Sequence, residues 1–277
     1  MKPENFLSLG IIGDKRVAHS LSPRMHNAIM KRRGITGAYV PFPVESAVVG
    51  SAVAGIRALG INGVNVTVPH KKAVMDHLDQ LSDTAQRAGA VNTILRRNKT
   101  LEGHNTDVGG FIDALEQTGF DVAGKTALVA GAGGAARAVL LALQALEPKR
   151  VILTGRDQNK VEPLAKEMLA VPLPWTELTH AAGEAGLIVN ATAVSSPDES
   201  PELAALVGKM EAGPRGLIFD LNYGRRENFW QDLAQRRGSI FLDGLPMLAN
   251  QARRSFAIWT GIEAPVEEFF QALTETT

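Results

Sequence analysis

Short apolar runs alternate with longer segments of helical spacing along the chain. In the first half, this pattern predicts buried strands at 8–13, 62–68 and 89–95. It predicts helices from Ser22-Pro23 to Gly34, at 73–81 and at 108–119. Because strand and helix alternate throughout, we expect parallel sheets that are covered by helices on both faces.

The same alternation begins again near Gly124. Strands are predicted at 125–131, 150–155, 186–192, 215–222 and 239–244. Helices are predicted at 134–146, at 158–170 and between the later strands. The stretch AVSSPDESPE, residues 193–202, has the composition of a mobile loop. The chain is therefore expected to be an α/β protein with two domains.

The composition of the chain limits the binding partners and the cellular compartment that we expect. With 277 residues, of which 45% are hydrophobic, the chain can bury a large core. Lys and Arg total 29, as do Asp and Glu, so no net field would attract nucleic acid or an anionic membrane. The chain has no cysteine, which excludes disulfides and fits a reducing compartment. Its first apolar run is too short for a signal or membrane span, so a cytoplasmic protein is expected.

The strand at 125–131 leads into a glycine-rich turn. Gly131, Gly133 and Ala136 form the pattern G-x-G-x-x-A between a predicted strand and a predicted helix. The glycines permit a tight turn, and the N-terminus of the helix can hold a pyrophosphate. The alternative is a tight turn without a ligand, which any α/β protein can contain. A second strand at the expected spacing favours a dinucleotide site.

The residues after that second strand indicate which dinucleotide binds. An acidic residue at the strand end usually meets a free ribose 2′-hydroxyl, but here the strand ends on Thr154 and Gly155. Arg156 follows, which suits a 2′-phosphate, and Lys160 adds a second positive charge one helical turn on. Asp157 could accept from a ribose hydroxyl or cap the next helix. NADP is favoured, and NAD is the alternative.

Polar residues repeatedly follow the predicted strands of the first half. They are Ser20, Ser22, Thr67, Lys71, Asn92 and Asp107. Ligands of open parallel sheets bind outside the carboxyl ends of the strands, so we expect these side chains to converge on one cleft. Local roles are the alternative, since Ser22 and Asp107 could cap helices and Asn92 could bond its own turn. Together, these groups suit a polyol or a hydroxy acid.

A series of segments, in this order and spacing, resembles shikimate dehydrogenases and their quinate/shikimate relatives. They are HSLSPRMHN, NVTVPHK, AGAVNT, GHNTD, GAGGAA, DGLPMLANQ and FAIWTG. The resemblance covers essentially the whole chain. It implies a substrate-binding catalytic domain at 1–106, completed by helices within 244–277, and a doubly wound Rossmann domain at 107–243 that binds NADP. The implied reaction is the reversible NADP-dependent reduction of 3-dehydroshikimate to shikimate, with no metal.

The resemblance also implies roles for individual residues. Lys71 and Asp107 would be the catalytic pair, because the family pattern N-V-T-x-P-x-K selects Lys71 rather than Lys72. The implied substrate-binding residues are Ser20, Ser22, Thr67, Asn92, Tyr223 and Gln251. The implied cofactor contacts are Gly131, Ala132, Gly133, Gly134, Ala135, Arg156, Gly244 and Met247. The chemistry agrees with Lys71, because hydride transfer requires a proton to move on the adjacent oxygen.

Several positions depart from the usual family sequence. Gly155-Arg156-Asp157 stands where N-R-T is usual, and the segment 190–195 lacks the usual glycine. Gly224 replaces a common proline, and Pro246 replaces a glycine. Two alternatives therefore stay open: a quinate/shikimate dehydrogenase that uses NAD or NADP, and a non-catalytic dinucleotide or metabolite sensor. Retention of the lysine and aspartate pair argues against the sensor. The protein is expected to be a monomer or a homodimer.

Overall fold

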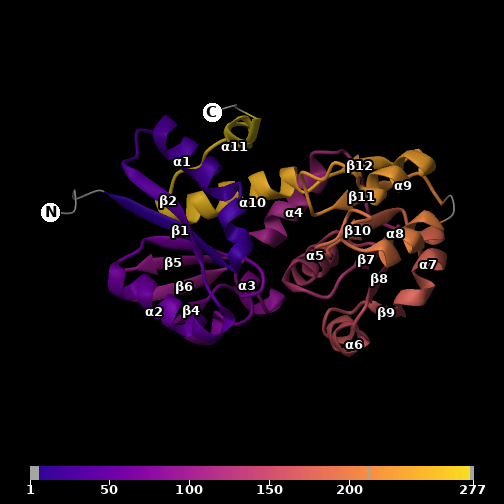
Figure 1. Cartoon of the computed structure of the whole chain (residues 1–277), viewed down its shortest axis with the longest axis horizontal. Helices are drawn as coiled ribbons and strands as arrows, with labels where there is room; N and C mark the ends of the chain where they lie inside the picture. The colour runs from indigo at the N-terminus through magenta and orange to yellow at the C-terminus, as the bar shows by residue number, and fades with distance from the viewer. Residues whose placement is uncertain (1–5, 211–212, 275–277) are drawn as a thin grey trace. The chain divides into compact units, whose positions relative to one another are not determined.

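The computed structural model describes residues 6–210 and 213–274. The chain divides into two compact units, Met1–Gly110 with Ala249–Thr277 and Phe111–Leu248. The polypeptide passes from one unit to the other inside two helices, α4 (Asp107–Glu116) and α10 (Leu245–Thr260). Each unit is built on a sheet with helices packed against it (Figure 1). Among the described helices, none is both long enough and apolar enough to cross a membrane.

The sheet of the first unit contains both parallel and antiparallel strands. Its order is β2 (Gly37–Pro43), β1 (Leu7–Gly13), β3 (Gly63–Val66), β5 (Thr93–Arg97), β6 (Thr100–His104) and β4 (Gln80–Leu81). β1 is parallel to β2 and β3, whereas β5 is antiparallel to β3 and β6. The expectation of a parallel sheet is therefore wrong here. Asn98 and Lys99 join β5 to β6, and a two-residue link permits a hairpin but no helical crossover.

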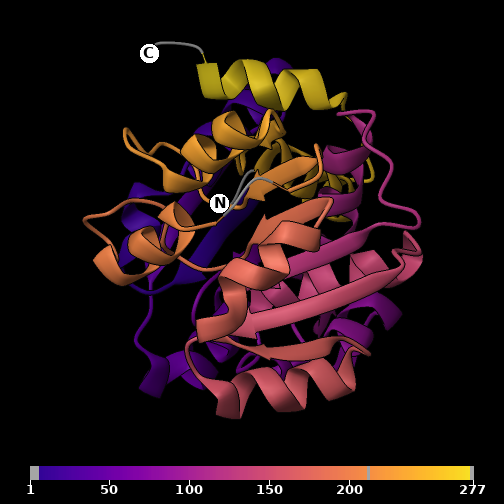
Figure 2. The same ribbon diagram turned by 90° about the vertical axis from the view of Figure 1, so that its right-hand side faces the viewer.

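Helices cover both faces of this sheet (Figure 1). They are α1 (Ser22–Arg32), α2 (Val49–Leu59), α3 (Asp83–Ala88), α10 and α11 (Val266–Thr274). Val64 and Val66 of β3 pack with Val53 of α2 on one face. Because side chains alternate along a strand, Asn65 points to the opposite face, where the Ser255 hydroxyl of α10 lies 3.1 Å from its amide nitrogen. On the outside of the unit, α11 lies beside α1, at the top of Figure 2.

One predicted element of this unit is wrong. The apolar spacing of residues 73–81 predicted a helix, but the structure contains a short 3-10 turn, Met75–His77, followed by β4. The backbone N–H of Asp79 donates to the Leu101 carbonyl, and the Asp79 carboxylate accepts the Leu101 N–H at 2.7 Å. These bonds to β6 hold the segment in an extended form. Long-range pairing has therefore overridden the local helical spacing.

The second unit has the doubly wound architecture that the sequence predicted. Its order is β12 (Ile240–Leu242), β11 (Leu217–Asp220), β10 (Leu187–Asn190), β7 (Thr126–Ala130), β8 (Arg150–Gly155) and β9 (Val171–Pro174). Neighbouring strands are parallel throughout this order. The direction of winding reverses between β7 and β10, and such a switch point is where open α/β sheets bind ligands.

Helices cover both faces of this second sheet (Figure 2). They are α5 (Gly134–Ala145), α6 (Gln158–Glu167), α7 (Leu178–Glu184), α8 (Pro201–Gly208) and α9 (Phe229–Arg237). Leu128, Ile188 and Ile218 form a core with Trp230 of α9 on one face. Phe219, the next residue of β11, stacks on Phe111 of α4 with ring centroids 5.1 Å apart. Because side chains alternate along each strand, both faces of the sheet carry apolar residues that pack against helices.

The loop predicted at residues 193–202 is held by hydrogen bonds. The backbone N–H groups of Ser195 and Ser196 donate to one carboxylate oxygen of Glu199, at 2.8 and 3.1 Å. Arg225 pairs with the other oxygen at 2.7 Å. Ser200 then caps α8 by accepting the Leu203 N–H. Glu199 thus links two segments that depart from the usual family sequence, since it accepts the Ser195 N–H of segment 193–195 and pairs with Arg225 of segment 224–226.

Candidate active site

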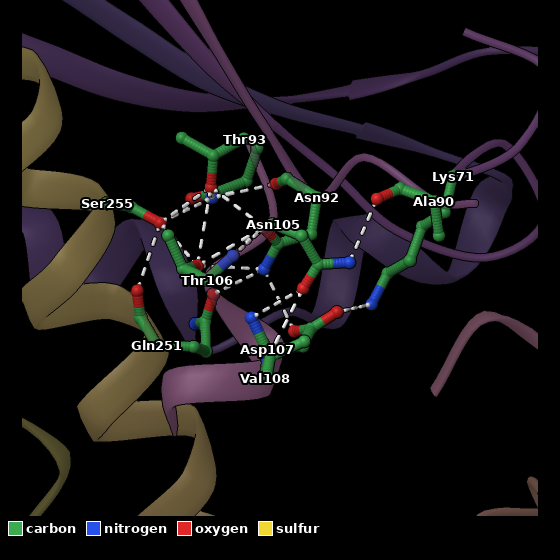
Figure 3. A network of polar contacts seen from close by, with 11 residues as sticks. Lys71, Ala90, Asn92, Thr93, Asn105, Thr106, Asp107, Val108, Gln251 and Ser255 are labelled. Atoms are coloured by element: carbon green, nitrogen blue, oxygen red, sulfur yellow. Dashed lines mark hydrogen bonds and ion pairs between the residues drawn. The ribbon is translucent and has the colours of Figure 1, made fainter. Parts of the chain in front are cut away.

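A buried ion pair marks the candidate active site of the first unit. The Lys71 Nζ lies 2.6 Å from Oδ2 of Asp107, and their side chains are only 14% and 7% exposed (Figure 3). Lys71 lies in the turn after β3, where its carbonyl accepts the Val91 N–H. Asp107 is the first residue of α4, just after β6. The structure therefore brings together the two residues that the sequence analysis assigned to catalysis.

A neighbouring residue caps the helix that begins at Asp107. The side-chain oxygen of Asn105 accepts the backbone N–H groups of Asp107 and Val108, at 3.0 and 3.3 Å. The Asn105 amide nitrogen is anchored on the Ala90 carbonyl at 2.9 Å. Because Asn105 accepts these N–H groups, the Asp107 carboxylate points instead to Lys71. The alternative role of Asp107 as a cap is therefore wrong.

Asn92 completes the surroundings of the Asp107 carboxylate. Its side-chain oxygen accepts the backbone N–H of Thr106 at 2.7 Å, and a backbone N–H can only donate. The amide nitrogen must therefore be the group that faces Asp107 Oδ1 at 2.8 Å and Gln251 Oε1 at 3.4 Å. Each carboxylate oxygen of Asp107 thus accepts one hydrogen bond, from Lys71 or from Asn92. Asn92 does not merely bond its own turn.

The remaining substrate candidates of this unit lie at the carboxyl ends of β1 and β3. Ser22 is the first residue of α1 and is buried, and Leu21 occupies the capping position, so the predicted capping role of Ser22 is wrong. Ser20 accepts the Ser22 N–H at 3.2 Å. Thr67 follows β3, and its N–H donates to the Ile12 carbonyl of β1 at 2.9 Å. Thr67 thus directly follows β3, whereas Ser20 and Ser22 follow β1 only after the 3-10 turn Lys15–His19.

The two residues that flank Lys71 in the chain, His70 and Lys72, differ from it in their surroundings. Lys72, which the family pattern does not select, is exposed. His70 is buried and bonds the Val44 carbonyl through Nε2 at 2.8 Å. Across residues 6–210 and 213–274, no three histidine, aspartate or glutamate side chains gather in an arrangement that could hold a metal ion.

His26 is a second buried histidine of this unit, and it is packed among aromatic rings. It stacks on Tyr39 with ring centroids 4.5 Å apart and also contacts Trp259. Neither ring nitrogen has a hydrogen-bond partner among the described residues. Burial lowers the pKa of His26 to about 3, so the ring is neutral at ordinary pH. This environment supports a structural role for His26.

The glycine-rich turn of the second unit joins β7 to the N-terminus of α5. Gly131 has φ +119°, and a Cβ there would lie 2.7 Å from the Ala191 carbonyl oxygen. Gly133 occupies the capping position of α5 without a side chain, and Gly134 begins the helix. Ala136 is fully buried where the helix meets the sheet. The N–H groups of the first helical turn have no intrahelical partners, so this end fits a pyrophosphate.

The end of β8 carries the residues that the sequence analysis expects to discriminate between dinucleotides. Arg156 directly follows the strand and is exposed. Asp157 precedes α6 at the capping position, but within the described residues its side chain accepts no hydrogen bond from the helix. Its carboxylate instead pairs with Lys160 at 3.3 Å on the surface. The capping interpretation of Asp157 is therefore wrong, and the charge of Lys160 is partly balanced.

Three further candidates belong to the second unit by chain position. Tyr223 follows β11 and is half-buried. Gly244 packs against the Leu221 carbonyl, where a side chain would clash, and its N–H donates to the Asn222 carbonyl at 2.9 Å. Met247 is buried in the first turns of α10. The roles that the family resemblance implies for these three residues stay predictions.

The sequence analysis missed several residues that bond the predicted ones. They are Asn65, Thr93, Asn105, Thr106 and Ser255, all buried within the first unit. Asn65, Thr93, Asn105 and Thr106 stand inside the quoted motifs NVTVPHK, AGAVNT and GHNTD, so the motifs carried a signal that was not used. Ser255 had no such signal, because an isolated serine in an amphipathic helix is common.

Comparison with known proteins identifies the family. The chain matches the family models described as the shikimate dehydrogenase substrate binding domain (residues 11–94), shikimate / quinate 5-dehydrogenase (114–226) and the shikimate 5′-dehydrogenase C-terminal domain (244–274). The NADP(+) shikimate dehydrogenase of a Synechocystis strain is 40% identical over 276 residues, covering 96% of this chain and 94% of that protein.

Solved structures agree with this assignment. The shikimate dehydrogenase of Aquifex aeolicus has a TM-score of 0.89 at 34% identity, covering 99% of this chain and all of that one (100%). The enzyme of Thermus thermophilus, solved in complex with NADP(H) and shikimate, has a TM-score of 0.85 at 36% identity, covering 96% and 98% of the two chains. The buried lysine and aspartate pair thus lies in a fold shared over nearly the full length. The chain belongs to the shikimate dehydrogenase family.

Proposed function

We propose that this protein is an NADP-dependent shikimate dehydrogenase that reversibly reduces 3-dehydroshikimate to shikimate. Its product would enter the biosynthesis of chorismate and the aromatic amino acids. The observation that carries the proposal is the buried pair of Lys71 and Asp107, with Asn92 on the second carboxylate oxygen, in a chain of this family. Relatives that share its length are named for this activity.

The first unit would bind the substrate. Asn92 and Gln251 face each other at 3.4 Å beside the ion pair, so their amides can bind the hydroxyl groups of shikimate next to the reacting carbon. Ser20, Ser22 and Thr67, at the ends of β1 and β3, would bind the remaining polar groups, including the carboxylate. Such a group of side chains favours a polyol acid over a molecule that lacks its hydroxyl groups, because buried polar groups that are left without hydrogen bonds cost free energy.

Lys71 would serve as the acid and base of the reaction. As the ketone becomes an alcohol, negative charge develops on its oxygen, and the Lys71 ammonium can donate a proton to that atom. Asp107 accepts from Nζ at 2.6 Å and so orients the lysine. In the oxidative direction, the neutral amine would take the proton back. The bound nicotinamide supplies or accepts the hydride.

The second unit would bind NADP(H). Gly131, Gly133 and the N-terminal turn of α5 fit the pyrophosphate, and Arg156, exposed at the end of β8, fits the 2′-phosphate. Lys160 would add positive charge, Gly244 and Met247 would contact the cofactor, and Tyr223 would bind the substrate, as the family resemblance implies. The proposed functional domains are 1–106 with 244–277 for the substrate and 107–243 for the cofactor. A cytoplasmic location and a monomeric or dimeric state stay predictions.

Steady-state assays that cross shikimate and quinate with NADP and NAD test this proposal. The proposal expects the highest kcat/KM for shikimate with NADP. A higher kcat/KM for quinate would identify a quinate/shikimate dehydrogenase instead. Binding of NADP without turnover of either substrate would identify a sensor, although a sensor has no use for a buried lysine and carboxylate pair.

A further inference from the structure

Ser255 lies at the centre of a buried polar network on the inner side of α10. Its side chain is fully buried. Its hydroxyl lies 2.8 Å from the Thr93 hydroxyl and 3.1 Å from the Thr106 hydroxyl, and it donates to the Gln251 carbonyl at 3.0 Å (Figure 3). The amide nitrogen of Asn65 donates to the same oxygen at 3.1 Å. One hydroxyl thus connects α10 with β3, β5 and the segment before α4.

The donors around Asn92 explain why this hydroxyl matters. Three donors converge on the side-chain oxygen of Asn92: the Thr106 N–H at 2.7 Å, the Thr106 hydroxyl at 3.2 Å and the Thr93 hydroxyl at 3.1 Å. An amide oxygen has two lone pairs and accepts two hydrogen bonds well. The Ser255 proton goes to the Gln251 carbonyl, and one lone pair of its oxygen accepts from Asn65, so the other lone pair is a second acceptor for the Thr93 or the Thr106 hydroxyl. It therefore relieves the competition for the Asn92 oxygen.

The far side of the network is fixed by Tyr39. Its hydroxyl donates to the Asn65 side-chain oxygen at 2.7 Å, which turns the Asn65 amide nitrogen toward Asn92, Thr93 and Ser255. Burial raises the pKa of Tyr39 well above its usual range, and hydrogen bonding with Ser22 opposes that rise. The phenol thus stays protonated as a donor. The Ser255 hydroxyl is held from one side by Asn65 and from the other by the two threonines.

We propose that Ser255 is a positioning residue of the dehydrogenase, and this inference rests on the function proposed above. By accepting from one of the threonines and donating to the Gln251 carbonyl, its hydroxyl keeps the Asn92 amide in the orientation that the Thr106 N–H sets and ties that amide to the helix that carries Gln251. The Asn92 amide in turn holds the Asp107 carboxylate toward Lys71. Ser255 touches neither member of the ion pair and acts through Asn92.

Three variants test the role of the hydroxyl. Ser255→Ala removes it, and Ser255→Cys keeps nearly the same volume but replaces it with a weak hydrogen-bonding group. Both should lower kcat by roughly tenfold and raise KM for shikimate by a smaller factor, with KM for NADP unchanged. Thr260→Ala is the control, because Thr260 makes the same bond to the carbonyl four residues earlier in α10, at 2.7 Å, outside the network. It should keep wild-type kinetics.

A measurement without turnover separates this inference from the proposed function. In ¹⁵N-labelled protein, the Asn92 side-chain NH₂ group should exchange with water faster in Ser255→Ala than in wild type, whatever the substrate proves to be. Unchanged exchange would overturn the inference. So would wild-type kinetics in Ser255→Ala, or full activity in Ser255→Cys with loss in Ser255→Ala, since the latter pattern would indicate packing volume. A wild-type enzyme that does not turn over shikimate would refute the proposed function alone.

Discussion

The side-chain oxygen of Asn105 accepts the backbone N–H of Asp107 at 3.0 Å, two residues along the chain. This bond caps α4 from a neighbouring position and leaves the Asp107 carboxylate to Lys71 and Asn92. An acidic side chain at the start of a helix could itself accept the free N–H groups there. In this protein, Asn105 accepts those N–H groups, and the Asp107 carboxylate stays paired with Lys71.

We predict that Asn105→Ala lowers both stability and turnover. Loss of a helix cap costs about 1 kcal/mol in the free energy of unfolding, measured by urea denaturation. Without Asn105, the Asp107 carboxylate can turn back to cap its own helix, so kcat should fall by several-fold or more. Ser82→Ala is a matched control, because Ser82 caps α3 by accepting the Ala85 N–H. It should lose stability and retain kcat. Equal kinetics in the two variants would contradict the role of Asn105.

Arg156→Ala should raise KM for NADP by roughly 10- to 100-fold and change KM for NAD little. The reason is that a charge-assisted hydrogen bond to a 2′-phosphate contributes about 1.5–3 kcal/mol, and NAD has no such phosphate. Initial rates with both cofactors measure the effect. Arg150→Ala serves as the control, since Arg150 is exposed at the opposite end of β8. An equal rise for both cofactors would refute a phosphate contact. A shift from NAD to NADP in Asp157→Thr would show that Asp157 binds the ribose.

The buried His26 should make stability depend on pH. Burial lowers its folded-state pKa to about 3 from an ordinary value of 6.5. Between these values the unfolded chain binds a proton that the folded protein excludes, so the free energy of unfolding falls as the pH is lowered. The slope can reach about 1.4 kcal/mol per pH unit. Urea unfolding from pH 7 to pH 4 should show a shallower fall in His26→Phe than in wild type.

The control for that series is His180→Gln, since His180 is exposed. Its pH dependence should follow that of the wild type. Phenylalanine at position 26 keeps a ring against Tyr39, so a loss of stacking should not obscure the comparison. If the free energy of unfolding falls equally with pH in wild type and His26→Phe, a group other than His26 must cause the loss of stability at low pH.

The sequence predicted the second unit better than the first for a physical reason. Strands such as Leu187–Asn190 are buried on both faces and read as continuous apolar runs, and their parallel order follows from helical crossovers. In the first unit, the strand Gly37–Pro43 was missed because it contains two prolines. It lies at the edge of the sheet, where a missing N–H is tolerated.

In the candidate site, too, some residues could be predicted from the sequence and others could not. Lys71, Asn92 and Asp107 stand in local motifs, and their contacts agree with the grouping expected from strand ends. Ser255 joins the network only through folding, because its bond to Asn65 spans 190 residues. Asp79 misled the secondary-structure prediction for the same reason, since its partner Leu101 lies 22 residues on. Contacts of this kind leave no local pattern to recognise.

The turnover number of Lys71→Ala tests the central claim most directly. If Lys71 exchanges a proton with the reacting oxygen, taking it in the oxidation of shikimate and returning it in the reduction of the ketone, kcat for shikimate with NADP should fall by about 10² to 10⁴, with a smaller change in KM. Lys72→Ala changes the adjacent, exposed lysine and should keep wild-type turnover. Circular dichroism should show that both variants are folded. A Lys71→Ala enzyme that turns over at nearly the wild-type rate would contradict the assignment of Lys71 as the acid and base.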